Sequence, residues 1–251
     1  MTQNANTARW ARALVIGASS GIGAEIARQL SAEGTHVALV ARRESELRAL
    51  ASELPGSPAL VYAHDVTCAE EVPGLFQTIC RDLGGLDLFV YAAGVMPRVL
   101  DDEYTFAKDR QIIEVNVLGA IAWIDEVAPR FAEARSGTLI GIGSVAGDRG
   151  RKPQPVYCTS KAALETYLEA VRNRIGRFGV KVVTIKPGPV DTPLTKEVDK
   201  KPLLIPAERA AREILSAAAR GKRVVYVPGV WRAIMAVIRA VPSPVFQKLN
   251  L

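Results

Sequence analysis

Two residues that could transfer a proton together stand one helical turn apart. Tyr157 and Lys161 lie four positions apart, and the sequence through Glu165 favours a helix, so both side chains are expected on one helix face. A phenol with a pKa of about 10 is a poor acid or base at neutral pH, but a neighbouring ammonium lowers that pKa by stabilising the phenolate. The pair therefore predicts general acid–base chemistry, with Tyr157 exchanging the proton.

A serine upstream of this pair could bind the group that receives the proton. Ser144 directly follows the apolar run Thr138–Gly143. If this run is a strand of a parallel sheet, Ser144 lies at the edge of the sheet where ligands of open α/β folds bind. Its hydroxyl would then hydrogen-bond the same substrate oxygen. Each of these residues alone is an ordinary structural feature, so the prediction rests on their combination.

A glycine-rich turn near the N-terminus has the residue types needed to bind a phosphate. The turn joins an apolar run, Ala13–Ile16, to a segment of helical pattern, residues 24–30. Glycines let the backbone approach a pyrophosphate closely, and the following helix offers free N–H groups and the positive end of its dipole. A tight turn without a ligand is the alternative. The predicted dinucleotide contacts are Gly17, Ser19, Ser20, Gly21, Ile22 and Gly23.

Short apolar runs alternate with longer segments of helical period along the whole chain. Because the runs are almost continuously apolar, they fit strands covered on both faces, as in a parallel sheet with right-handed crossovers. The sequence therefore predicts an α/β fold, a single doubly wound parallel sheet of the Rossmann type with helices on both faces. No repeat or linker interrupts the alternation, so residues 1–251 are expected to form one domain. The predicted strands are Ala13–Ile16, Val37–Val40, Leu60–Ala63, Leu86–Ala92, Thr138–Ile142, Val180–Ile185 and Val224–Val227.

Composition argues against several other classes of protein. The net charge is +6, but basic and acidic residues alternate instead of forming a tract, so no nucleic-acid partner is expected. The three cysteines have no CxxC spacing and the two histidines lie apart from them, so no metal site is expected. We found no leader-like N-terminus and no apolar run long enough to span a bilayer, and we expect a cytoplasmic, reduced protein.

The order and spacing of these motifs are similar to those of the short-chain dehydrogenase/reductase family. The resemblance covers residues 13 to about 227 and is carried by the Gly-x-x-x-Gly-x-Gly turn and by Ser144, Tyr157 and Lys161. It implies that Asn116 is the fourth member of an Asn-Ser-Tyr-Lys catalytic tetrad and holds a water that links Lys161 to solvent. It also implies that Lys161 reaches the ribose hydroxyls of the nicotinamide nucleotide.

The resemblance assigns further cofactor contacts at the ends of the later strands. In the family, an Asp-Val pair flanks the adenine ring, an Asn-Ala-Gly segment follows the fourth strand, and a Pro-Gly segment after the sixth leads to the nicotinamide carboxamide. This chain has Ala92 where the family usually has Asn, which removes one supporting side chain. For Asp65 a plain helix cap is the alternative. The matching residues are Asp65, Val66, Ala93, Gly94, Pro187, Gly188, Val190 and Thr192.

Two arginines after the second predicted strand indicate which cofactor is bound. An acidic residue at this point would hydrogen-bond a free ribose 2′-hydroxyl, whereas an arginine pairs with a 2′-phosphate. The chain has Arg42 and Arg43 here. This favours NADP(H), with Arg42 as the main phosphate contact and Arg43 sharing it. A solvated start to the next helix is the alternative interpretation.

Together these features predict an NADP(H)-dependent oxidoreductase that moves a hydride between the nicotinamide and a small ketone or secondary alcohol. Tyr157 would exchange the proton and Ser144 would orient the oxygen. The alternative is a catalytically silent, nucleotide-sensing Rossmann protein. A methyltransferase is disfavoured because it would not need Tyr157, Lys161 and Ser144 together.

Three further regions are expected to serve substrate access or assembly. Residues 187–206 contain several prolines and no clear period, which predicts a mobile substrate loop. The segments Arg110–Ala134 and Pro155–Phe178 resemble the helices that join subunits in the family, which implies a homodimer or homotetramer. The apolar tail, residues 229–251, is expected to pack on the protein or to make a peripheral membrane contact. Its predicted helical stripe is Val230, Ala233, Ile234, Val237, Ile238 and Val241.

Overall fold

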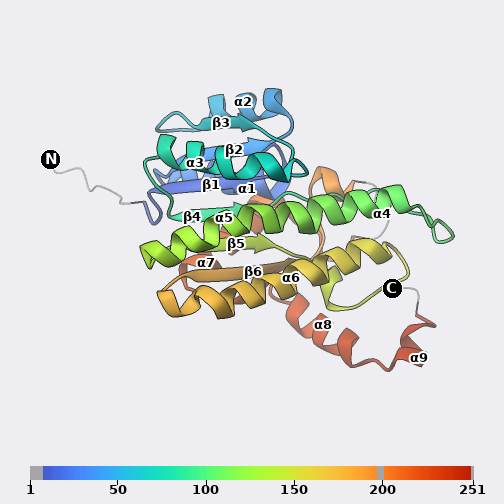
Figure 1. The fold of residues 1–251 in the computed structure, drawn as a ribbon. Coiled ribbons are helices and arrows are strands. Elements are labelled where there is room, and N and C mark those ends of the chain that lie inside the picture. The colour runs from blue at the N-terminus through green and yellow to red at the C-terminus, as the bar shows by residue number, and fades with distance from the viewer. Residues whose placement is uncertain (1–7, 197–200, 250–251) are drawn as a thin grey trace.

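A seven-stranded sheet forms the centre of the protein (Figure 1). The computed structural model describes residues 8–196 and 201–249. Its main sheet has the strand order β3-β2-β1-β4-β5-β6-β9, and every neighbouring pair is parallel. The predicted doubly wound parallel sheet is therefore confirmed, and every predicted strand is present. The strands are β1 Arg12–Ile16, β2 His36–Ala41, β3 Leu60–Ala63, β4 Leu88–Tyr91, β5 Thr138–Ile142, β6 Lys181–Pro187 and β9 Val224–Val227.

Helices cover both faces of this sheet because its strands are apolar on both sides. Along β1, Ala13 and Val15 belong to one hydrophobic cluster, whereas Leu14 and Ile16 belong to the other, as the alternation of side chains in a strand requires. The helices that close the first cluster are α1 Gly21–Ala32, α2 Glu44–Glu53 and α7 Ala207–Ala219. Those that close the second are α3 Val72–Asp82, α5 Gly119–Ala134 and α6 Pro155–Ile175.

The remaining elements connect the strands or follow the last one. Before α5, the helix α4 Phe106–Ile113 runs without a break into η2 Glu114–Leu118, a π-helical segment. Two helices follow β9, α8 Trp231–Ala240 and α9 Ser243–Phe246. The single helical turns are η1 Ala69–Glu71, η3 Val145–Asp148, η4 Gly176–Phe178 and η5 Pro193–Thr195.

The winding direction of the sheet reverses between β1 and β4. The chain moves outward from β1 to β2 and β3, then returns to place β4 on the other side of β1. Connections on the two sides of this point leave in opposite directions, which opens a crevice at the carboxyl ends of the strands. The residues that follow β1 and β4 therefore border the same crevice.

The segment 187–206 has more regular structure than its sequence predicted. Two short strands, β7 Val190–Asp191 and β8 Ile205–Pro206, pair in parallel. Val190 and Ile205 are both buried in the first hydrophobic cluster, which anchors the two ends of the segment. Residues 197–200 lie outside the described residues, and the mobility of the segment stays a prediction.

The tail packs on the protein with a different face from the predicted stripe. Trp231, Ile234, Met235 and Ile238 pack against Val145 and Tyr226. Of the predicted stripe, Ile234 and Ile238 do pack here, whereas Val230 is 51% exposed and Val237 is 68% exposed, so the buried face is shifted by about one position from the predicted one. Burying the larger Trp and Met side chains removes more apolar surface from water. Membrane contact by the exposed face stays a prediction.

The described residues contain neither a membrane-spanning helix nor a metal-binding group of side chains. In these residues no helix has the length and apolar character required to cross a bilayer. The same part of the chain contains no group of three His, Cys, Asp or Glu side chains arranged to hold a metal ion.

Candidate active site

A cleft at the carboxyl edge of the sheet brings most of the predicted site residues together. It lies where β1 and β4 end, and the ends of β2, β5 and β6 also border it. Every residue predicted to act in catalysis or to bind the cofactor lines this cleft, except Gly23 and Asn116. Sequence analysis did not assign several other apolar residues of its wall to the site, among them Val115 and Ile142, because they carry no motif.

Close backbone packing at the end of β1 requires glycine at two positions. A Cβ atom on Gly17, which has a φ of +84°, would lie 2.5 Å from Ala93 N, and one on Gly23 would overlap Gly17 O. Gly17 N–H donates to Val40 O at 2.8 Å. The turn then enters α1, whose first turn has no acidic side chain. A helix N-terminus with glycine backbone and no competing carboxylate fits the pyrophosphate of a dinucleotide.

The two arginines after β2 have different partners. Arg43 Nη2 donates to Ser19 Oγ at 2.8 Å and to Ser20 Oγ at 2.9 Å, so its guanidinium lies at the glycine-rich turn. Arg42 Nη1 instead lies 3.7 Å from Asp65 Oδ2. Both arginine side chains are at least half exposed. In this structure Arg43 therefore contacts the glycine-rich turn, whereas Arg42 contacts Asp65.

Two cofactor contacts implied by the family resemblance have structural partners of their own. Asp65 Oδ1 accepts hydrogen bonds from Thr67 N at 3.0 Å and from Thr67 Oγ1 at 2.9 Å, so this side chain does cap its own turn. Thr192 lies over the glycine-rich turn, because a Cβ atom on Gly21 would be 3.0 Å from Thr192 Cγ2. The segment after β6 therefore folds back over the turn after β1.

The loss of the family's asparagine after β4 leaves the local backbone pairing intact. Ala92 N–H donates to Ile16 O at 2.9 Å, and the Ala92 side chain packs on the first hydrophobic cluster. Gly94, two residues later, leaves space where a Cβ atom would lie 3.5 Å from Lys161 Nζ. The close approach of this turn to Lys161 is therefore retained.

Tyr157 and Ser144 lie buried at the inner end of the cleft. Tyr157 stands in the first turn of α6, and Ser144 follows β5 directly before η3. Tyr157 is 7% exposed and Ser144 is 9% exposed. Ser144 Oγ accepts the Ala146 N–H at 3.1 Å, and the Ser144 N–H donates to Glu165 Oε1 at 3.0 Å. These bonds fix the direction of the serine hydroxyl. Glu165 was not among the predicted site residues, although it follows Lys161 by one helical turn.

Burial is the largest influence on the pKa values of Tyr157 and Lys161. Burial raises the pKa of Tyr157 to about 12, and Ser144 and Arg151 oppose this rise. Lys161 Nζ donates to Ile142 O at 2.9 Å and lies 5.7 Å from the centre of the Tyr157 ring. Burial lowers the pKa of Lys161 to about 8. The prediction that Lys161 lowers the tyrosine's pKa is wrong for this structure, because the lysine is directed to a backbone carbonyl and burial disfavours its charged form.

Asn116 stands in the π-helical segment η2 and is fully buried. Its Nδ2 donates to Val95 O at 3.1 Å and to Ser160 Oγ at 3.0 Å, and its Oδ1 accepts the Val95 N–H at 2.8 Å. The side chain therefore ties the cleft wall to α6. A π-helical turn inside an α-helix is common at functional sites. The implied water between Asn116 and Lys161 stays a prediction.

Comparison with known proteins identifies the family. The sequence profile of the short chain dehydrogenases matches residues 11–203. An uncharacterised oxidoreductase of Staphylococcus epidermidis is 34% identical over 187 residues, which cover 74% of this chain and 81% of the relative. One of Staphylococcus aureus is 36% identical over 183 residues, which cover 73% and 79%. The chain belongs to the short-chain dehydrogenase/reductase family and is an oxidoreductase of that family.

Solved structures share the same fold. A short-chain type dehydrogenase/reductase from Mycobacterium marinum is 28% identical, with a TM-score of 0.79, and the match covers 86% of this chain and 93% of that one. ElxO, whose structure holds NADP, is 22% identical with a TM-score of 0.77, and the match covers 88% and 99%. At that identity the likeness to ElxO concerns the fold alone. The family resemblance and the Rossmann-type fold are confirmed.

The lowered pKa of Lys161 predicts a change in stability with pH. The lysine has an ordinary pKa of 10.5 and a folded-state pKa of about 8, so the unfolded chain binds more protons between these values. The stability that this group contributes is present above pH 10.5 and is lost as pH falls toward 8. The free energy of unfolding of wild type, relative to Lys161→Met, should rise by about 2 kcal/mol between about pH 7.5 and about pH 9.5.

Urea denaturation at several pH values measures this difference. The exposed lysine Lys222 provides the control, because Lys222→Met removes the same side chain from a solvated position. A difference between wild type and Lys161→Met that stays constant with pH would contradict the lowered pKa.

Proposed function

We propose that the protein is an NADP(H)-dependent oxidoreductase that interconverts a ketone and a secondary alcohol. The observation that carries this proposal is that the buried residues Tyr157, Ser144 and Lys161 line the same cleft as the glycine-rich turn. The cleft residues would hold a nicotinamide cofactor, which in its reduced form would supply a hydride for the carbonyl carbon. The residues of the chain must then supply the proton and hold the oxygen in place.

Tyr157 is suited to donate that proton. Because its pKa is raised to about 12, its hydroxyl is protonated at neutral pH and can donate to an oxygen that gains negative charge. Ser144 holds the same oxygen with its hydroxyl. Lys161, with a pKa of about 8, titrates close to neutral pH and can return a proton to the phenolate. Reduction uses the protonated form of Tyr157, and the reverse reaction uses the same residues in the opposite order.

The preference for NADP(H) rests on Arg43 with Ser19 and Ser20. The Arg43 guanidinium and both serine hydroxyls converge at one point beside the phosphate turn. A ribose 2′-phosphate at this point would accept charge-assisted hydrogen bonds from the guanidinium. A free ribose 2′-hydroxyl carries no negative charge, so it would not form these charge-assisted hydrogen bonds. Both arginines also pair with a carboxylate, Arg42 with Asp65 at 3.7 Å and Arg43 with Glu46 at 2.8 Å. Arg42 is the secondary contact because the contacts with the two serines belong to Arg43.

Other properties of the protein stay predictions. The three loops Val95–Thr105, Val145–Val156 and Pro189–Pro206 are expected to choose the substrate, and their sequences contain no transferable code. The homodimer or homotetramer and the cytoplasmic location also rest on sequence alone.

Replacing Tyr157 by Phe tests the proton donor. The ring still fills its buried position, and only the hydroxyl is lost, so Tyr157→Phe should lower kcat by about 10²–10⁴-fold while NADPH binding is nearly unchanged. Turnover is measured by NADPH oxidation with isatin, ethyl acetoacetate and phenanthrenequinone, and binding is measured by NADPH fluorescence.

Tyr167 on the same helix is the matched control, because its hydroxyl donates to Asp125 at 2.6 Å and is not part of the cleft. Tyr167→Phe should retain wild-type turnover. Near-normal turnover by Tyr157→Phe would overturn the mechanism. Tight NADPH binding by a wild-type protein that reduces no ketone in a wider panel would instead favour the catalytically silent alternative.

Replacing each arginine tests the cofactor preference. Wild type should bind NADPH more tightly than NADH, and Arg43→Ala should narrow the difference by about 1.5–3 kcal/mol, the contribution of a hydrogen bond to a charged group. Arg42→Ala should have a smaller effect, and Arg48→Ala, which removes an arginine paired only with Glu44, should have none. Equal wild-type affinities would contradict NADP(H). A larger effect of Arg42→Ala than of Arg43→Ala would indicate that Arg42 is the main contact of the 2′-phosphate.

A further inference from the structure

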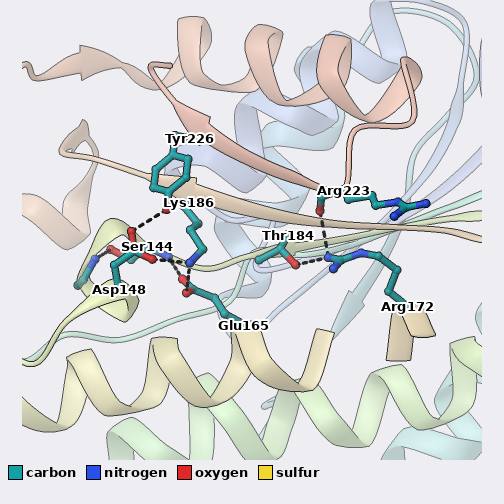
Figure 2. Close-up of polar contacts among 9 residues, drawn as sticks. Ser144, Asp148, Glu165, Arg172, Thr184, Lys186, Arg223 and Tyr226 are labelled. Carbon is teal, nitrogen blue, oxygen red and sulfur yellow. Dashed lines mark hydrogen bonds and ion pairs between the residues drawn. The ribbon is translucent and has the colours of Figure 1, made fainter. Parts of the chain in front are cut away.

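A buried ion-pair network lies directly behind Ser144 (Figure 2). Glu165 Oε1 accepts the Ser144 N–H at 3.0 Å. Lys186 Nζ lies 2.8 Å from Glu165 Oε2 and 2.5 Å from Asp148 Oδ1. Tyr226 Oη donates to Asp148 Oδ2 at 2.8 Å. The network therefore connects β6 and β9 to α6 and to η3, the turn that follows Ser144.

The charges of this network are almost completely removed from water. The side chains of Asp148, Glu165 and Lys186 are 2%, 8% and 14% exposed. Burial raises the pKa of Glu165, and the Lys186 ammonium opposes that rise, whereas Asp148 adds to it. Two buried carboxylates near one another repel unless a cation pairs with them or one of them is protonated, and here the cation is Lys186. The positions of both carboxylates therefore depend on Lys186.

The backbone around Ser144 is shaped to enclose the Glu165 carboxylate. A Cβ atom on Gly143 would lie 2.5 Å from Glu165 Oε1, and one on Gly147 would lie 2.6 Å from Glu165 Oε2. Glycine at these two positions lets the chain pass close to the carboxylate on both sides of Ser144. Residues 143–148, which we call the serine segment, are thus held by Glu165 along their length and by Asp148 at their end.

We propose that Lys186 is a positioning residue, which holds the serine segment through Glu165 and Asp148 and thereby directs the Ser144 hydroxyl at the substrate oxygen. This inference rests on the proposed function, because the direction of Ser144 matters when an oxygen is bound beside it. Lys186 touches no reacting atom in this scheme. A displacement of an orienting group by about 1 Å is enough to lower turnover by about 10²-fold.

Arg172 offers a matched control on the same helix and the same pair of strands. Its Nη2 donates to Thr184 Oγ1 at 2.6 Å and to Arg223 O at 3.0 Å, so it also connects α6 to β6 and to the start of β9. Figure 2 shows that this second set of contacts lies apart from Ser144. Arg172→Met therefore removes a partly buried cation from the same interface and leaves the contacts of the serine segment in place.

Hydrogen–deuterium exchange tests the positioning role without any substrate. In Lys186→Met, the backbone amides of residues 143–148 should exchange at least about tenfold faster than in wild type, because local opening of the segment becomes easier. In Arg172→Met, exchange of the same amides should stay within about twofold of wild type. Unchanged exchange in Lys186→Met, or an equal increase in both variants, would overturn the proposal even if the protein reduces no ketone.

Kinetics with the most rapidly reduced ketone of the panel, isatin, ethyl acetoacetate or phenanthrenequinone, then test the consequence for turnover. Lys186→Met should lower kcat by about 10–100-fold, with the KM for the ketone and the Kd for NADPH within about threefold of wild type. Arg172→Met should retain kcat within about twofold. A loss of kcat shared by both variants indicates general destabilisation and would overturn the positioning role.

A second variant covers the case in which Lys186→Met does not fold. Glu165→Gln keeps the shape of the side chain and an oxygen for the Ser144 N–H, but it removes the charge that pairs with Lys186. It should also increase exchange in the serine segment and lower kcat at nearly constant KM. Wild-type exchange and kcat in a folded Glu165→Gln variant would contradict the proposal.

Discussion

The parallel direction of every strand in the main sheet is the constraint on which the site depends. Because all strands point the same way, their carboxyl ends meet at one edge, and residues as distant in sequence as Gly17 and Thr192 border one cleft. Helices must cover both faces of such a sheet, so the cleft opens only along that edge. The overlap that any Cβ atom on Gly17 would make with Ala93 shows how closely the ends of β1 and β4 approach there.

Two buried lysines at this edge illustrate how partners decide the charge of an interior group. Lys161 donates to a backbone carbonyl, and burial lowers its pKa to about 8. Lys186 lies just as close to two carboxylates, and these raise its pKa against the opposing effect of burial. The first lysine can therefore gain and lose a proton near neutral pH, whereas the second stays a cation. We assign proton return to the former and positioning of Ser144 to the latter.

Sequence patterns could predict the fold and the main site residues because each depends on local features. Buried strands are continuous apolar runs, and the glycine turn and the Tyr157–Lys161 pair have fixed spacings. Side-chain partners depend on distant parts of the chain and were harder to predict. The contacts of Arg43 with Ser19 and Ser20, and the burial of Trp231 against Val145, depend on such distant pairings.

Two features of the sequence are consistent with the ion-pair network behind Ser144, although neither was used to predict it. Lys186 is a charged residue near the end of β6, directly after the buried run Val182–Ile185, where a charged side chain is uncommon. Glu165 follows Lys161 by four residues on the same helix face. Neither feature predicts which side chain Lys186 or Glu165 contacts, because α6 lies beside β6 and η3 only in the folded chain.

The most direct test of the proposed chemistry follows the hydride itself. Ethyl acetoacetate, whose product has no exchangeable hydrogen on the carbinol carbon, is reduced with NADPH that carries deuterium at the transferred position of the nicotinamide, and the alcohol is examined by mass spectrometry and proton NMR. Direct hydride transfer predicts one deuterium on the carbinol carbon and none on the hydroxyl after exchange with water. An alcohol without deuterium at that carbon, formed at a rate that depends on the protein, would contradict it.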